Sequence, residues 1–118
     1  MNETEILKDL DLNTCSENWF KIPFSNITYT DGINDLIIKA KCWWLISDIG
    51  ILISATPKLQ KDFLILTIET ENEKGIITLK EDSNEKPIYK KELEYTDFPL
   101  SKFEFFITNN VMLLKSEY

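Results

Sequence analysis

Residues 43–54 constrain the fold more than any other stretch, because they have helical spacing and are apolar on nearly every side. Leu45, Ile49 and Ile53 recur at one-turn intervals, and Ile51 falls on an adjacent face. A helix with so little polar surface is stable in water only when other elements cover it. We therefore predict that this helix, which Pro57 ends, is the central buried helix of the domain.

Downstream of this helix the apolar pattern changes from helical to alternating. Residues 63–69 are predicted to form a strand that places Leu64, Leu66 and Ile68 on one face. The polar run at 71–75 predicts a hairpin loop in which Gly75 takes a positive φ. Residues 76–81 are then the partner strand, and residues 87–95 are a third strand with one apolar and one charged face. These segments predict a meander of three antiparallel strands covered by the central helix.

Three further helices are expected. The first spans residues 3–11 with Asn2 or Thr4 as its N-cap, and the second begins at Thr30 or Asp31. The last begins at Pro99, because proline suits the first turn of a helix. Its buried face is predicted to consist of Phe103, Phe106 and Ile107.

Residues 13–28 follow no single period and are predicted to form a loop with one short strand, whereas residues 111–114 predict a final short strand. The expected fold class is α+β, with a small antiparallel meander of three to four strands packed against three to four helices. Residues 1–118 fit a single domain, in which an N-terminal helix at 1–12 precedes a core at 13–118.

The composition excludes several chemistries. The chain has no histidine and no arginine, which removes Ser-His-Asp and Cys-His catalysis and the usual zinc sites. Its three glycines are too few for a glycine-rich phosphate loop. We therefore expect a protein that is not an enzyme and that uses no cofactor or metal.

The two cysteines, Cys15 and Cys42, are far apart and form no Cys-x-x-Cys motif, so both are expected to be reduced, buried thiols. The N-terminal residues are acidic and polar, unlike a secretory signal. The most apolar stretch, residues 42–55, is interrupted by Asp48 and is shorter than the roughly 20 residues that span a bilayer. These features predict a cytoplasmic protein.

The formal net charge is −7, and all the basic residues are lysines. Direct binding of naked DNA or RNA is therefore not expected, because phosphate contacts need clustered basic side chains. An acidic surface either keeps a protein soluble or docks on a basic surface of another protein.

Two groups of residues are candidates for such a docking surface. The tryptophans can act as aromatic anchors, and the acidic residues lie at the tips of the expected hairpins. The candidate binding residues are Trp19, Trp43, Trp44, Glu71, Glu73, Glu81, Asp82 and Glu85. The alternative roles are core packing for the tryptophans and solvated loops for the acids, and a surface tryptophan also suits a homodimer.

Three aspartates support a second hypothesis, in which the chain is a carboxylate-based enzyme or a metal- or ligand-binding domain. Asp31 and Asp97 occur in matching Tyr-Thr-Asp segments, and could meet if both helix starts lay at one end of the sheet. Asp48 lies within the apolar helix, where a pocket could perturb its acidity. The alternatives are helix capping for Asp31 and Asp97, and an exposed helix edge for Asp48.

Four short segments follow a specific order: Tyr-Thr-Asp-Gly at 29–32, Trp-Trp-Leu at 43–45 with Asp48 after it, Tyr-Thr-Asp-Phe-Pro-Leu at 95–100, and Ser-Glu-Tyr at 116–118. This order resembles an uncharacterised bacterial family of the domain-of-unknown-function kind, over roughly residues 13–118. In residues 13–28 members of that family carry Tyr and His, whereas this chain has Trp19 and no histidine. The resemblance implies one intact domain and no known activity.

Small size, acidity and a composition rich in lysine, isoleucine and asparagine are similar to accessory proteins of phages and mobile elements, including anti-CRISPR inhibitors of host nucleases. By this analogy we expect a non-enzymatic binding protein that docks on a basic nucleic-acid-processing protein.

Overall fold

The computed structural model describes residues 2–14 and 17–118. Within these residues the helices are α1 (Glu3–Leu10), α2 (Asp31–Ala40) and α3 (Trp43–Ala55), with short 3-10 turns η1 (Pro57–Leu59) and η2 (Lys115–Glu117). The strands are β1 (Trp19–Lys21), β2 (Thr28–Thr30), β3 (Phe63–Glu71), β4 (Lys74–Lys80), β5 (Tyr89–Leu93), β6 (Lys102–Thr108) and β7 (Val111–Leu113). None of the helices in the described residues has both the length and the apolar character needed to cross a bilayer.

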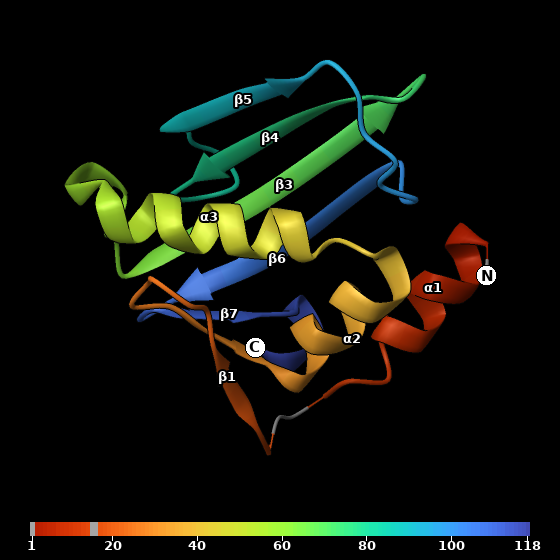
Figure 1. The fold of residues 1–118 in the computed structure, drawn as a ribbon, viewed down its shortest axis with the longest axis horizontal. Coiled ribbons are helices and arrows are strands. Elements are labelled where there is room, and N and C mark those ends of the chain that lie inside the picture. Colours follow the sequence, from red (N-terminus) through yellow and green to blue (C-terminus); the bar gives the residue numbers. More distant parts are fainter. Residues whose placement is uncertain (1, 15–16) are drawn as a thin grey trace.

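The strands form one seven-stranded sheet in the order β1-β2-β7-β6-β3-β4-β5. The sheet is mixed, because β2 and β7 are parallel while the other pairs are antiparallel. The predicted small meander of three to four antiparallel strands is therefore wrong. The α+β class is correct, since the helices lie together on one face of this sheet (Figure 1).

The expected helix after Pro99 is the largest error. Residues 102–108 instead form β6, a central strand that pairs with β3 on one side and β7 on the other. Phe105 and Ile107 point into the core, whereas Phe106 lies on the opposite face of the sheet. Because apolar residues occupy 103, 105, 106 and 107, the pattern fits either period. Pairing with β3 and β7 satisfies the backbone hydrogen bonds of residues 102–108, and this pairing favours a strand.

Residues 19–30 contain two strands where one was expected. β1 and β2 pair as a hairpin, and β2 then joins the sheet through β7. An aromatic row fastens this hairpin to the helical layer. The Phe20 and Tyr29 rings stack at a centroid distance of 5.2 Å, and Tyr29 meets the Trp43 ring edge-on at 5.9 Å.

The predicted β3–β4 hairpin is confirmed, but its turn differs from the prediction. Glu71 pairs with Lys74, so only Asn72 and Glu73 form the loop. Both have a positive φ, of 53° and 63°, whereas Gly75 does not. A two-residue loop with two left-handed residues matches the twist of the flanking strands.

The predicted helix at 43–54 is confirmed as α3, and it lies across the middle of the sheet (Figure 1). Only its inner side is buried, through Leu45, Ile46, Ile49 and Ile53. Gly50 allows the turn between β1 and β2 to approach α3 closely, because a Cβ at residue 50 would lie 2.6 Å from Cδ1 of Ile22. The expectation of a helix buried all round is therefore met on one side only.

The N-termini of α1 and α2 are capped by side chains, as predicted. Asn2 accepts a hydrogen bond from the Glu5 backbone N–H at 2.9 Å, and the Thr30 hydroxyl accepts one from the Ile33 N–H at 3.4 Å. These side chains satisfy backbone donors that the first helical turn leaves unpaired.

Cys42 is a buried thiol, as expected, while Cys15 lies outside the described residues. Burial raises the pKa of Cys42 from 9.0 to about 12, and its thiol donates to the Leu36 carbonyl at 3.7 Å. In a Cys15→Ser variant we expect native alkylation at pH 8 to be at least about 1,000-fold slower than in denaturant, since each pKa unit is a factor of ten in thiolate. The rate of iodoacetamide labelling measures this, and comparable rates in both states would contradict it.

The raised pKa of Cys42 also makes the stability of the fold depend on pH. The pKa of Cys42 is higher in the folded state than in the unfolded state. The contribution of this thiol to the free energy of unfolding is therefore complete below pH 9.0 and decreases as the pH rises toward about 12.

Candidate functional site

A large hollow lies at the β3–β4 turn end of the sheet, on the face away from the helices. Its volume is about 990 Å³, and its lining includes four glutamates and two lysines. We call this cavity the acidic hollow. The charged side chains that line it are Glu69, Glu71, Glu92, Glu94, Lys74 and Lys102.

Strand register places these charges around one apolar residue. Ile76 is paired directly with Glu69 of β3 on one side and with Glu92 of β5 on the other. Directly paired residues have Cβ atoms about 5 Å apart on the same face. Ile76 is 38% exposed, so the floor of the acidic hollow is an accessible isoleucine between two carboxylates.

The lysines neutralise only part of this charge. Lys102 reaches Glu69 with an Nζ–Oε1 distance of 3.6 Å, in a pair whose side chains are both more than half exposed. Such exposed pairs contribute little to stability. No ion pair among the described residues involves Glu71, Glu92 or Glu94, so the acidic hollow keeps a negative field.

The segment after β5 holds the turn beside the acidic hollow. The Thr96 backbone N–H donates to the Glu73 carbonyl at 2.7 Å, and the buried Thr96 hydroxyl accepts from the Phe98 N–H at 3.2 Å. This keeps Tyr95 at the surface, where it is 69% exposed. An exposed aromatic thus stands next to the acidic turn, in a position that sequence reasoning assigned to the buried face of a strand.

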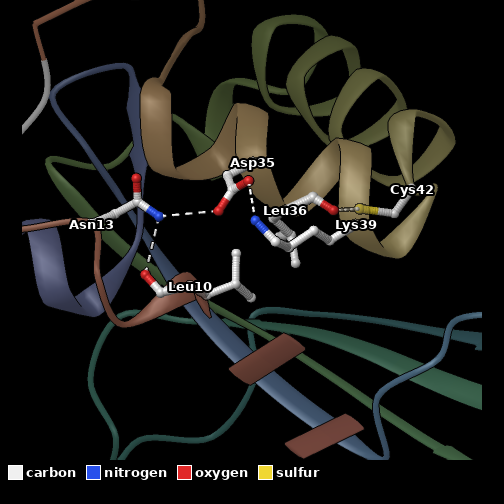
Figure 2. A network of polar contacts seen from close by, with 6 residues as sticks. All are labelled: Leu10, Asn13, Asp35, Leu36, Lys39 and Cys42. Atoms are coloured by element: carbon white, nitrogen blue, oxygen red, sulfur yellow. Dashed lines mark hydrogen bonds and ion pairs between the residues drawn. The ribbon is translucent and has the colours of Figure 1, made fainter. Parts of the chain in front are cut away.

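A second, smaller hollow of about 490 Å³ lies between the end of α1 and the outer side of α2. Figure 2 shows its polar network, in which Asp35 accepts from Asn13 Nδ2 at 3.3 Å and pairs with Lys39. Asp9 and Asp31 also line it. Lys39 pairs with Asp35, and the cross-strand row in which Ile76 gives the acidic hollow an exposed apolar floor has no counterpart among these charges.

Glu117 joins two segments that are far apart in the sequence. Its Oε1 accepts from the Thr30 hydroxyl at 2.7 Å and from the Leu114 N–H at 2.9 Å, and its Oε2 accepts from the Gly32 N–H at 3.2 Å. A carboxylate at the N-terminus of α2 also complements the helix dipole. The Tyr-Thr-Asp-Gly and Ser-Glu-Tyr segments therefore meet, and the contact is a structural clamp.

The rest of the C-terminal segment lies on the sheet face away from the helices. Tyr118 packs its ring on Phe63 and Phe106, at centroid distances of 5.8 and 5.1 Å. Lys115 Nζ contacts Glu104 Oε1 at 2.5 Å, and this hydrogen bond, together with that from Thr67, lowers the pKa of the Glu104 carboxyl. This segment thus covers the centre of that face and leaves the acidic hollow open.

Comparison with known families agrees with the sequence reading. Residues 4–118 match the family of unknown function DUF6876. The chain belongs to this family. The resemblance to an uncharacterised family is confirmed at this level, and no curated protein and no solved structure matches the chain.

The predicted binding residues of this DUF6876 domain do not gather on one surface. Glu71 and Glu73 lie at the β3–β4 turn, whereas Glu81, Asp82 and Glu85 follow the other end of β4, about 20 Å away along the strand. The tryptophans are divided as well. Trp43 and Trp44 begin α3 on the helical side, and Trp19 lies on the edge strand β1, with 59% of its surface exposed.

The three aspartates of the second hypothesis lie on separate elements. Asp31 opens α2, where its Oδ2 accepts from the Glu17 and Asn18 N–H groups at 3.0 and 3.1 Å. Asp48 is exposed in the middle of α3, and Asp97 is exposed in the loop before β6. Among the described residues no three cysteine, aspartate or glutamate side chains are placed to hold a metal ion.

Proposed function

We propose that this domain is a non-enzymatic binding module that docks its acidic hollow on a basic segment of a protein partner. The observation that carries the proposal is the arrangement of Glu69, Ile76 and Glu92 in one cross-strand row, with Glu71 and Glu94 beside it. An apolar floor between carboxylates suits a lysine or arginine side chain, whose stem is apolar and whose head is charged.

The sheet supplies a rigid platform for this contact. Glu69 and Glu92 lie two strand spacings apart, about 10 Å, on the paired strands β3, β4 and β5. The exposed Tyr95 ring beside the turn adds an aromatic anchor of the kind that is enriched at binding hot spots. Complementary charge mainly raises the association rate and the specificity.

Nucleic-acid-processing proteins are the partner class that we propose, because their clefts present basic side chains to phosphates. The acidic hollow would occupy such a cleft in place of nucleic acid, and an inhibitor of a host nuclease of the anti-CRISPR kind would act in this way.

We expect charge reversal in the acidic hollow to weaken binding of a fluorescein-labelled oligo-arginine peptide. For the double variant Glu71→Lys with Glu92→Lys the dissociation constant is expected to rise at least about tenfold, equivalent to about 1.4 kcal/mol. Fluorescence anisotropy measures this constant, and the wild-type affinity is expected to fall as salt increases from about 50 to about 300 mM.

The matched control is Asp82→Lys with Glu85→Lys, which changes the net charge equally at the other end of β4. If both double variants weaken binding to the same extent, general attraction accounts for it and the proposed site is wrong. The partner class is tested by eluting bacterial proteins from the immobilised domain with DNA. Recovery of no nucleic-acid-processing protein contradicts that part of the proposal.

A further inference from the structure

β5 is the last strand at one end of the sheet, and no other strand in the described part of the chain pairs with its outer edge (Figure 1). The Leu79 carbonyl accepts from the Ile88 N–H at 2.8 Å, so Leu79 and every second residue before it on β4 direct their backbone groups toward β5. Their partners on β5 are Tyr89, Lys91 and Leu93. The backbone N–H and C=O groups of Lys90 and Glu92 therefore point to the open edge.

The charged side chains of β5 have no ion-pair partner within the described residues. Lys90, Lys91 and Glu92 are exposed, and none of the ion pairs found there includes them. Glu92 lines the acidic hollow, so Glu92 and Lys90 project from the sheet face away from the helices. Lys91 projects from the opposite face, where it alternates with the half-buried Tyr89 and Leu93.

The sequence of β5 is complementary to itself in an antiparallel arrangement. When a second copy of β5 is placed with Lys91 on the twofold axis, Lys90 of each copy lies opposite Glu92 of the other. Tyr89 of each copy then lies opposite Leu93 of the other, on the helix side. Hydrogen bonding allows this register, because the free backbone groups of Lys90 and Glu92 face each other. A shift by two residues in either direction puts Lys90 or Glu92 opposite its own symmetry mate.

The charges of β5 also select against other strands. Lysines on an edge strand discourage pairing, and like charges directly opposite each other are destabilising. A uniformly basic strand would place a like charge opposite Lys90, and a uniformly acidic one would do so opposite Glu92. A second copy of β5 matches both residues. Its one like-charged pair is Lys91 with its mate, and because Lys91 is exposed the two side chains can diverge into solvent.

We propose that two copies of this chain pair through β5, in a twofold-symmetric dimer whose sheet is continuous across both copies. This assembly goes beyond the binding function proposed above. Both acidic hollows then lie on one face of the joined sheet, on either side of the axis, so that a partner with two basic segments gains avidity. Two five-residue strands form a small contact compared with stable interfaces of about 1,200 Å² or more. We therefore expect a dissociation constant of about 10 to 100 μM.

Charge exchange between residues 90 and 92 tests this register. Lys90→Glu and Glu92→Lys each create two like-charged pairs, and we expect each to raise the dimer dissociation constant at least about tenfold in about 50 mM salt. An equimolar mixture of the two variants restores both opposite-charge pairs, so it is expected to form a heterodimer about as tightly as the wild type associates. Sedimentation velocity of the full chain without ligand measures these constants, and circular dichroism checks that each variant is folded.

The matched control is Lys91→Glu, which changes the net charge as much as Lys90→Glu does. It replaces one like-charged pair on the axis by another, so the dissociation constant is expected to stay within about threefold of the wild type. A wild type that stays monomeric up to about 1 mM overturns the proposal, and the lysines would then serve to block the edge. The proposal is also wrong if the mixture fails to associate, or if Lys91→Glu dissociates as readily as Lys90→Glu.

Discussion

Replacing Phe105 with alanine is expected to lower the free energy of unfolding by about 4 kcal/mol, the largest loss from any single substitution considered for this chain. The Phe105 ring is fully buried on the central strand β6, opposite Leu66 of β3 and beneath the helical layer. Its removal leaves a cavity that neighbouring strands cannot close. A total stability of about 5 to 15 kcal/mol would be reduced by about a quarter or more.

Urea denaturation followed by circular dichroism measures this loss, and Phe106→Ala is the matched control. The Phe106 ring lies on the other face of β6, half-buried between Phe63 and Tyr118. We expect its removal to cost about half as much as that of Phe105. The opposite order would indicate that residues 102–108 are helical, since a helix would bury Phe106 and expose Phe105.

Replacing Gly32 with alanine is expected to destabilise the protein by about 2 kcal/mol, although alanine is the better helix former by about 1 kcal/mol. A Cβ at this position would lie 2.2 Å from Glu117 Oε1 and 2.8 Å from Cδ1 of Leu114. The Glu117 carboxylate cannot move aside freely, because Thr30, Gly32 and Leu114 all donate hydrogen bonds to it. The steric cost therefore exceeds the gain in helix propensity.

A double-mutant cycle identifies the cause. With Glu117→Ala in the background, the carboxylate is gone and only the Leu114 contact opposes a Cβ at residue 32. We expect the cost of Gly32→Ala to fall there by at least about 1 kcal/mol. Equal costs in both backgrounds would show that the clash with Glu117 does not control the stability of this junction. Thermal and urea unfolding of the four proteins give the required values.

The elements that the sequence predicts best are those with long and unambiguous periods. α2 begins where its Thr30 cap predicts, and α3 ends shortly before Pro57, as expected. The β3–β4 hairpin follows from its alternating residues and polar turn. In contrast, β6 is apolar at consecutive positions, so that neither period excludes the other, and only its pairing with β3 and β7 makes it a strand.

Long-range pairing accounts for the remaining errors. β1, β2 and β7 have three residues each, and a three-residue strand carries almost no periodic signal. The parallel contact between residues 28–29 and 111–112 joins segments more than 80 positions apart. No local pattern in either segment indicates its partner.

The candidate site was only partly predictable for the same reason. Acidic residues near the β3–β4 turn were expected, and Glu71 lines the acidic hollow. Glu92 and Ile76 were not singled out, because their convergence with Glu69 depends on the register of three strands. These residues alternate with core residues along their strands. Once the strand pairing is known, this alternation places them together on the face away from the core.

The place of β7 in the sheet has a consequence for the order of folding. The β1–β2 hairpin, although it is near the start of residues 1–118, contacts the rest of the sheet only through β7. During synthesis β3, β4, β5 and β6 can pair as they emerge, but the hairpin has no partner strand in the rest of the sheet until residues 111–113 arrive. A nascent chain would therefore leave one edge of β2 unpaired until the last strand enters, and chaperone binding at this stage would be concentrated on that N-terminal hairpin.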